Sequence, residues 1–498
     1  MPMKSVHRSR FSVALFLQGS FFVFKKPIRR RMDNREKEEL FLQSTKSATS
    51  SSSENGQSLS TWKAAILGFQ HLLAMYSGDV LVPLLIGGAL HFNAMQMAYL
   101  ISADIFMCGI ATLLQLKRTP LTGIGLPVVL GCAVQAVTPL EAIGSNYGVG
   151  AMYGAIISAG IFVFLSAGWF SRIKNFFPPV VTGSLITIIG FTLIPVGFQD
   201  LGGGSATAKN FGDPKFLLIG FLTMAIILGL NAFAKGFMKS LAILAGILIG
   251  TLIAGGMGMV SLAPVAQASW FHLPQFFYFG TPKFEWSSIL TMILVSLTTM
   301  VESTGVFFAL ADITGKKLEE NDLKRGYRAE GIAVILGGLF NTFPYSTFSE
   351  NVGVVQLSGV KTRKPLYFSA AFLILLGMLP KIGALATVIP NPVLGGAMIV
   401  MFGMVGVQGI RMLQQVDFKD NNNLLVSAIS IGLGLGVTVY PQIFQAFPQS
   451  LQIILNNGVV VGSFSAVILN IIFNMRPHRA ISPAQAQVNS NAQSQNRN

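Results

Sequence analysis

The chain has 498 residues, of which 52% are hydrophobic and only 11% are charged. A soluble domain carries roughly 25% charged residues, so the composition excludes a soluble enzyme or binding domain. The net charge of +15 does not indicate a nucleic-acid-binding protein, because the Lys and Arg residues lie mainly between apolar segments, where the positive-inside rule places them.

Residues 1–61 are expected to form a cytoplasmic, largely disordered tail, because the stretch from Ser44 to Leu59 is rich in small polar residues. The apolar stretch from Phe11 to Phe24 is too short to span a bilayer. Met32 opens a hydrophilic stretch. Residues 1–31 are therefore either part of this tail or an artefact of a start codon assigned upstream of the true one. Residues 475–498 are expected to be a second disordered cytoplasmic tail.

Between the tails, apolar runs of about 20 residues recur, the length that crosses a bilayer as a helix. The sequence therefore predicts an all-α polytopic membrane protein with a transporter domain over residues 62–474. Fourteen spans are expected, at residues 62–90, 93–116, 122–138, 149–171, 177–198, 215–234, 238–259, 285–311, 329–343, 346–359, 365–389, 392–411, 422–440 and 450–474. Loops on one side then carry most of the Lys and Arg residues, which places both termini in the cytoplasm.

The spans repeat in two halves, residues 62–259 and 285–474. FFPPVVTGSLITIIGF (176–191) in the fifth span resembles VIPNPVLGGAMIVMFG (388–403) in the twelfth, seven spans later. The third and tenth spans, also seven apart, are both short and interrupted by Gly, Pro or small polar residues. Repeats of seven spans have opposite orientations, and paired interrupted segments in inverted repeats indicate the midplane binding site of a transporter.

Three carboxylates fall within the apolar part of the chain. Glu302 lies in the eighth span, Glu330 is expected to open the ninth, and Glu350 follows the break in the tenth. A carboxylate at the bilayer centre costs about 2.5–3.5 kcal/mol on insertion scales, so Glu302 and Glu350 are candidates to bind a polar substrate or carry a proton. Glu330, close to the cations from Lys324 to Arg328, is equally consistent with an interfacial ion pair.

Other polar residues in the spans have weaker signals. His71 in the first span is interpreted mainly as a hydrogen-bonded structural residue. Asp79, beside Gly78 and Pro83, is a further site candidate or a group that satisfies freed backbone atoms. The two cysteines show no metal-ligand spacing, and no metal or cofactor is expected.

At these residues the chain resembles the nucleobase–ascorbate transporters, also called nucleobase:cation symporters of the second type. The resemblance covers about residues 62–474. It rests on GFQHLLAMYSGDVLVPLLIG, on VESTGVFFALAD and on the signature in FSENVGVVQLSG. It implies fourteen spans in two inverted repeats of seven, with the third and tenth spans broken by short strands. It also implies a core domain, a gate domain and assembly as a homodimer in the cell membrane.

Within that family the chain looks most like bacterial xanthine permeases, with urate permeases next. The resemblance implies that Glu302 binds the base and links to a coupling proton, and that Glu350 binds the other edge of the ring. The Ser349 backbone and the strand near Ala133 and Val134 complete the pocket. Three further residues are implied to support proton coupling or brace the site: Glu330, His71 and Asn351.

Three residues depart from the xanthine and uracil patterns. Xanthine and urate carriers usually have Gln where this chain has Glu350, uracil permeases usually have Glu there and His at the place of Ser303, and the pocket strand usually carries Phe where Val134 stands. The remaining context favours proton-coupled import of xanthine, with urate and uracil as alternatives. The inverted-repeat fold also leaves an anion exchanger or sulfate carrier open. Enzyme motifs such as GxxxxGK[ST], HExxH and GxSxG do not occur.

Overall fold

The computed structural model describes residues 60–172 and 178–474. The predicted tails therefore lie outside the described residues, except for Ser60 and Thr61 at the start. The side chain of Glu350 is also outside the described part, although its backbone lies in a helix.

The described residues form two packed groups of helices. We call the first the strand-bearing group; it contains α2 (Thr61–Ala89), α3 (Ala94–Leu116), β1 (Leu130–Cys132), η2 (Val134–Ala136), α4 (Val137–Tyr147), α5 (Val149–Phe170), α12 (Trp286–Thr314), α13 (Glu320–Leu339), β2 (Tyr345–Thr347), α14 (Ser349–Ser358), α15 (Lys364–Gly377) and α16 (Pro380–Thr387). We call the second the α6–α17 group; it contains α6 (Pro179–Thr192), α7 (Ile194–Leu201), α8 (Pro214–Phe233), α10 (Ala242–Gly256), α17 (Asn391–Leu413), α18 (Asn421–Val439) and α20 (Gly458–Asn474). Four short helices lie between these elements in the chain: α9 (Phe237–Ser240), α11 (Ala263–Gln267), η4 (Pro441–Phe444) and α19 (Gln449–Leu455).

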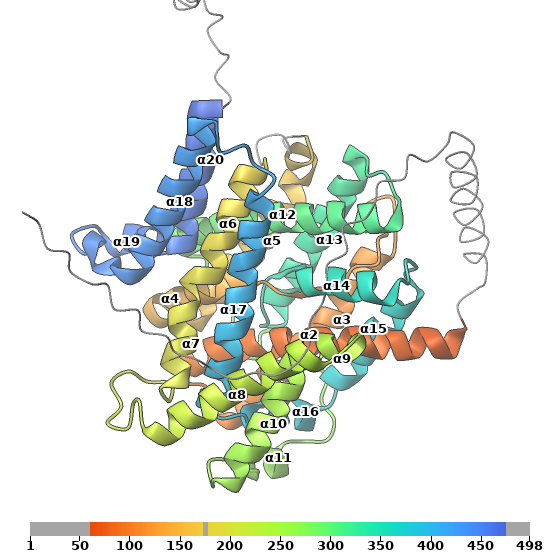
Figure 1. Cartoon of the computed structure of the whole chain (residues 1–498), viewed down its shortest axis with the longest axis vertical. Helices are drawn as coiled ribbons and strands as arrows, with labels where there is room; N and C mark the ends of the chain where they lie inside the picture. The colour runs from red at the N-terminus through yellow and green to blue at the C-terminus, as the bar shows by residue number, and fades with distance from the viewer. Residues whose placement is uncertain (1–59, 173–177, 475–498) are drawn as a thin grey trace, which may run out of the picture. The chain divides into compact units, whose positions relative to one another are not determined.

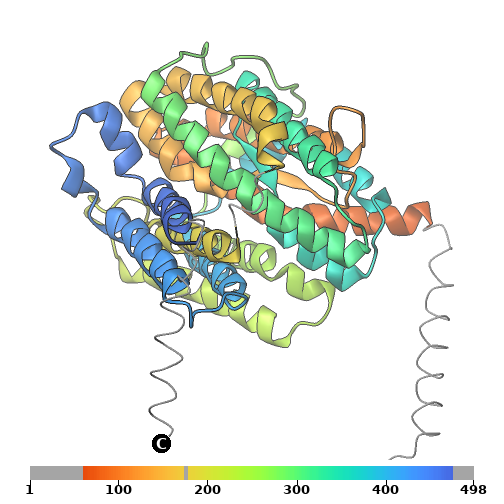
Figure 2. The same cartoon turned by 90° about the horizontal axis from the view of Figure 1, so that it is seen from above.

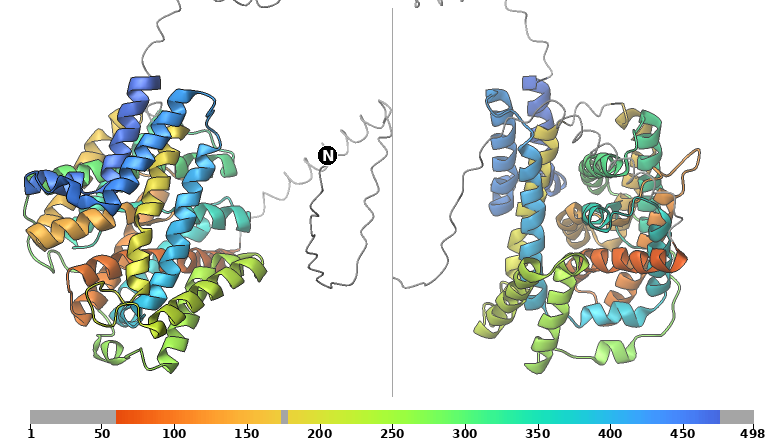
Figure 3. Two further views of the ribbon diagram at one scale, coloured as in Figure 1. Left: turned by 60° about the vertical axis from the view of Figure 1, so that its left-hand side comes forward. Right: turned by 45° about the vertical axis from the view of Figure 1, so that its right-hand side comes forward.

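Figure 1 labels these elements, and Figure 2 shows the two groups apart. In Figure 2, α5, α12 and α13 lie together, whereas blue α18 and α20 lie on the other side of the molecule. Yellow α6 runs beside blue α17 in both views of Figure 3. These two helices begin at the Pro-containing segments that the repeat comparison paired, with Pro179 and Pro392 in their first turns. Proline suits this position because an N–H group in the first turn would have no acceptor within the helix, so its absence costs nothing.

Two short strands lie inside the strand-bearing group, one in each half of the chain. β1 and β2 pair antiparallel, with Gly131 opposite Ser346. The pairing continues on one side, where the Phe348 N–H donates to the Val129 carbonyl at 3.0 Å. Gly131 is needed for this approach, because a Cβ there would lie 2.2 Å from Asp79 Oδ1 and 2.5 Å from the Phe348 ring.

Fewer than fourteen helices of the described residues are long enough to be continuous membrane spans. Among the described residues, eight helices are long and apolar enough to cross a membrane, or ten if two bent pairs each count as one span. The bends are 81° between α15 and α16 and 71° between α19 and α20. The third and tenth predicted spans are a strand followed by short helices, and α10 has only 15 residues. The fourteen-span count therefore stays a prediction.

Large apolar side chains on the outer faces of the helices are consistent with a lipid environment. In the α6–α17 group they include Leu218 and Phe233 of α8, Leu248 and Leu252 of α10, and Leu433 of α18, each at least 44% exposed. Aqueous solvent would make such a continuous apolar surface unfavourable. Together with the long apolar helices, it indicates an integral membrane protein.

The start of α12, the helix that carries Glu302, is fixed by a side-chain cap. Glu285 accepts hydrogen bonds from the backbone N–H groups of Ser287 and Ser288 at 3.1 and 2.7 Å, and from both hydroxyls. Burial alone would raise the pKa of Glu285, but these hydrogen bonds outweigh it and lower the pKa to about 2. The ionised carboxylate therefore stabilises the first turn of this helix.

Candidate functional site

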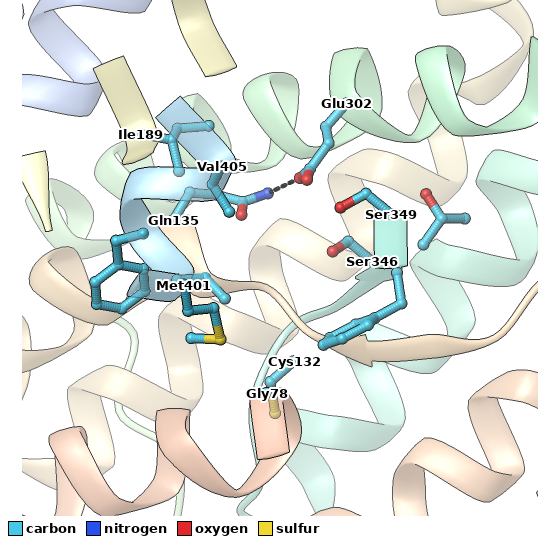
Figure 4. Close-up of a pocket in the computed structure, with 13 residues that line it drawn as sticks. Gly78, Cys132, Gln135, Ile189, Glu302, Ser346, Ser349, Met401 and Val405 are labelled. Atoms are coloured by element: carbon cyan, nitrogen blue, oxygen red, sulfur yellow. Dashed lines mark hydrogen bonds between the residues drawn. The ribbon is translucent and has the colours of Figure 1, made fainter. Parts of the chain in front are cut away.

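A small cavity lies where the strand pair meets the α6–α17 group (Figure 4). Its polar wall comes from β1, η2, α12, β2 and α14, and its apolar wall from α6 and α17. The lining residues are Gly78, Cys132, Val134, Gln135, Ile189, Glu302, Ser346, Thr347, Phe348, Ser349, Met401, Phe402 and Val405. Residues from both halves of the chain thus meet at one point, which is the arrangement that the interrupted spans predict.

Glu302 is the acidic residue that lines this cavity. It is half-buried on α12, and Gln135 Nε2 donates to its Oε2 at 2.9 Å, as the dashed line in Figure 4 shows. The same Gln135 nitrogen donates to Thr299 Oγ1 at 3.1 Å. Because Gln135 is buried and has two acceptors on α12, it holds the Glu302 carboxylate in a defined orientation toward the cavity. The sequence analysis did not single out Gln135, although its amide stands directly after the third-span break.

Two short helices begin at the cavity. Val134 is the first residue of η2 and Ser349 is the first residue of α14, and both line the cavity. The positive end of the α14 dipole therefore lies at the cavity and favours an electron-rich group there. Glu350 is the next residue of α14, so its backbone is at the cavity edge, while its side chain lies outside the described set. Ala133 is buried behind the lining, and its N–H donates to the Pro344 carbonyl at 2.9 Å.

His71 and Asn351 form a pair next to the cavity and do not line it. His71 Nδ1 and Asn351 Oδ1 are 2.6 Å apart, and Asn351 Nδ2 donates to the Pro127 carbonyl at 2.9 Å. Both side chains are buried. They connect α2, α14 and the segment before β1, so their position suits bracing of the second half-helix.

Glu330, which the sequence predicts to open the ninth span, does not stand at the start of its helix. It lies in the middle of α13, which begins at Glu320, so the cations from Lys324 to Arg328 are part of the same helix. Glu330 is 1% exposed, and neither of its carboxylate oxygens has a hydrogen-bond partner within normal distance among the described residues. Ser303, the Thr347 backbone and the charge of Glu302 are nevertheless close enough to interact with it. Glu330 forms no ion pair with another residue of the described ranges.

A second polar cluster surrounds Cys132, which also lines the cavity. Asp79 Oδ1 accepts from the Cys132 N–H at 3.1 Å. Asp79 therefore satisfies a backbone group of β1, which is one of its two interpretations from the sequence. The Cys132 thiol donates to the Asp104 carboxylate at 2.9–3.0 Å. One ligand atom each of Asp79, Cys108 and Cys132 lies within 4.8 Å of the others. Such donors suit a thiophilic metal, but they also satisfy one another by hydrogen bonds, and the expectation of no metal stays a prediction.

The cavity is narrow in this conformation. Its volume is about 40 Å³, far below the roughly 300 Å³ of the smallest typical ligand pockets. The apolar wall, formed by Ile189, Met401, Phe402 and Val405, closes it. Sequence reasoning missed these four residues, because apolar residues in apolar helices carry no signal of their own. A planar ring does not fit a cavity of this volume.

Comparisons with known proteins decide the family. A profile described as "Permease family" matches residues 62–443. The chain is 53% identical over 411 residues to the uric acid permease PucK of Bacillus subtilis. The matched stretch covers 82% of this chain and 95% of PucK. It is 52% identical over 413 residues to the xanthine permease of the same organism, covering 83% of this chain and 94% of the permease.

The chain belongs to the nucleobase–ascorbate transporter family. It is accordingly a membrane transporter for small molecules and not an enzyme. The transmembrane domain of a cyanobacterial bicarbonate transporter, BicA, has a similar fold, with a TM-score of 0.54 at 14% identity over 82% of this chain and 98% of that chain. This likeness concerns the fold alone, because anion carriers and nucleobase permeases place different side chains on one scaffold.

Proposed function

We propose that this protein imports a purine base, xanthine in the first place, by proton symport with alternating access. The observation that carries the proposal is the Gln135–Glu302 pair at 2.9 Å, which faces the N-terminal end of α14 across a cavity between the two helix groups. Membership of the family and the xanthine permease at 52% identity support the substrate class.

The chemistry of this cavity suits a neutral, planar base with several N–H donors and carbonyl acceptors. The Glu302 carboxylate accepts from ring N–H groups, and the Gln135 amide oxygen offers a further acceptor, because its NH2 group already donates to Thr299 and Glu302. The end of α14 at Ser349 presents backbone N–H groups to a ring carbonyl, and Glu350 beside it would accept from the opposite edge of the ring. An unmatched polar group in such a site costs about 1–3 kcal/mol, which discriminates among bases.

Proton coupling is proposed from the second buried carboxylate. Glu330 lies close enough to Glu302 for their charges to interact, and both stand on adjacent helices, α12 and α13. Two ionised carboxylates repel each other in a low-dielectric interior, so one proton held between them lowers the energy of the pair. We propose that this proton enters with the substrate and leaves from Glu302 on the cytoplasmic side. His71 and Asn351 would brace α14 during the cycle.

Alternating access is proposed as a movement of the α6–α17 group, as gate domain, against the strand-bearing group, as core domain. The apolar wall on α6 and α17 and the polar wall on the core meet at the narrow cavity, so separation on one side opens the site to that side only. Fourteen spans, with both termini cytoplasmic, a cell-membrane location and a homodimer, belong to the same proposal.

Urate is the second candidate, because the uric acid permease PucK is 53% identical over nearly its whole length. Urate and xanthine share the purine ring and differ at the imidazole edge. Uracil is the third candidate, and Glu350 matches the uracil pattern noted from the sequence.

One uptake screen tests the proposal. Cells that lack their own base permeases would express this protein and receive labelled xanthine, urate, guanine, uracil or sulfate, with and without a protonophore. Xanthine or urate uptake that the protonophore abolishes is expected. Glu302→Gln should abolish accumulation, whereas Asp312→Asn, an exposed site on the same helix, should not. Uptake of sulfate alone, or base uptake that follows sodium at fixed pH, would refute the proposal.

A further inference from the structure

A second and larger cavity lies away from the substrate site, between loops from both halves of the chain. Its volume is about 480 Å³. It is lined by Gly125 and Pro127 before β1, Lys316 after α12, and Lys361, Thr362, Arg363, Lys364 and Tyr367 around the start of α15. We call it the basic cavity. Four of its eight lining residues are cationic and none is acidic, although a volume of this size is typical of ligand sites.

Two cations of the basic cavity donate to backbone carbonyls. Lys316 Nζ donates to the Gly125 carbonyl at 2.9 Å, and Arg363 Nη1 donates to the Leu116 carbonyl at 2.7 Å. Among residues 60–172 and 178–474, neither of these nor Lys361 forms an ion pair. The nearby carboxylate of Asp322 is instead paired with Arg118 and Arg325.

The positive charges at this cavity act on one another. The pKa of Lys316 is lowered, first by burial and then by the charges of Arg363 and Arg118, and Asp322 offsets only part of this. Cations gathered at one cavity repel one another, and an anion bound there would reduce this repulsion. The positive-inside rule explains why cations gather in such loops, but it does not explain why they surround a cavity.

The start of α15 adds a directed contribution. Arg363 is its N-cap residue and makes no side-chain cap, and Lys364 and Pro365 form its first turn. The dipole of this 14-residue helix favours a negative group at its N-terminus, while the N–H groups of Leu366 and Tyr367 bond to the Arg363 carbonyl and Pro365 has no N–H. Tyr367, one turn further, lines the cavity, and its hydroxyl donates to the Leu116 carbonyl at 3.3 Å. The cations and the helix dipole together match the oxygen atoms of a phosphate group.

We propose that the basic cavity binds a phosphate group, carried either by the headgroup of an anionic phospholipid or by a soluble phosphate compound. The cavity also contacts the core of the transporter: its wall residue Pro127 accepts the hydrogen bond from Asn351, and Lys361 follows α14 by three residues. Occupancy of this site therefore holds the C-terminal end of the half-helix whose other end lies at the substrate cavity. The inference does not depend on which base is transported.

Thermal unfolding of the purified full-length protein in a neutral detergent tests this site. The additives are dioctanoyl phosphatidylglycerol, dioctanoyl phosphatidylcholine as neutral lipid, sodium phosphate, pyrophosphate, and potassium chloride at matched ionic strength. We expect phosphatidylglycerol or pyrophosphate to raise the unfolding temperature by several degrees beyond the chloride control, because a ligand that binds only the folded state stabilises it. A shift with phosphatidylglycerol alone identifies a lipid headgroup, and a shift with pyrophosphate identifies a soluble phosphate compound.

Charge-removal variants assign the effect to this cavity. Lys316→Gln/Lys361→Gln should lose most of the shift, and Lys361→Gln alone, at an exposed side chain, should reduce it in case the double variant folds poorly. Lys317→Gln is the matched control, since Lys317 is adjacent and exposed but does not line the cavity. The proposal is overturned if no phosphate compound exceeds chloride, or if the lysine variants keep the full shift.

Discussion

The hydrogen bond between Gln135 and Glu302 gives the sharpest prediction about the site. Gln135→Leu keeps the approximate size of the side chain but removes the donor 2.9 Å from Glu302 Oε2. A hydrogen bond to a charged group contributes about 1.5–3 kcal/mol, and about 1.4 kcal/mol corresponds to a factor of ten in affinity. We therefore expect Gln135→Leu to weaken xanthine binding about 10- to 100-fold.

The measurement is calorimetric titration of purified wild type and variants with xanthine, together with unfolding temperatures to verify folding. Thr299→Val is the matched control, because it removes the other acceptor of Gln135 at 3.1 Å and leaves the Glu302 contact intact; we expect less than about a threefold loss there, since a neutral partner contributes less. A double-mutant cycle with Glu302→Gln separates orientation of the carboxylate from direct contact with the base. Wild-type affinity in Gln135→Leu, or fully additive effects in the cycle, would refute the reasoning.

Three further predictions follow from other contacts. Glu350→Ala should abolish uptake and Glu350→Gln should largely retain xanthine uptake, since an amide still offers an acceptor to the ring; wild-type uptake and competition in Glu350→Ala would remove this residue from the site. Glu285, with a pKa of about 2 against an unperturbed value of 4.5, stabilises the fold above pH 4.5 and loses this contribution as the pH falls toward 2. Glu285→Gln should therefore unfold at lower temperature than wild type at pH 6, with the gap narrowing below pH 4.5; a gap independent of pH contradicts this. Gly190→Ala should destabilise the purified protein by about 1–3 kcal/mol, because its Cβ would lie 2.1 Å from a backbone nitrogen of α17, whereas Gly229→Ala, with no atom within 4 Å, should not.

The polar half of the site could be predicted from the sequence, because charge and broken helices are rare at membrane depth. Glu302 lines the cavity as that reasoning expected, and so do Ser349 and Val134, which the family resemblance implied. Gln135 could also have been predicted as a site residue, because its amide stands directly after the break in the third span. The contact between His71 and Asn351, 280 residues apart, needed the fold, since spacing along the chain cannot show which distant polar groups meet.

Two parts of the structure could not be derived from local patterns. The start of α13 could not be predicted, because hydropathy begins a segment where charges end, whereas this helix begins at Glu320 and includes the charged residues before Glu330. The apolar wall on α6 and α17 was missed for the opposite reason, since Met401 and Val405 look like any lipid-facing or packed residue. Only their position opposite Glu302 gives them a role in closing the cavity.

Accumulation of labelled xanthine by proteoliposomes that contain only this protein tests the central claim most directly. With an inward proton gradient and no sodium, wild type should concentrate xanthine above the external level, and a protonophore or Glu302→Gln should reduce this to equilibration or less. Accumulation that persists without the proton gradient, or that Glu302→Gln leaves unchanged, would contradict proton symport through this carboxylate.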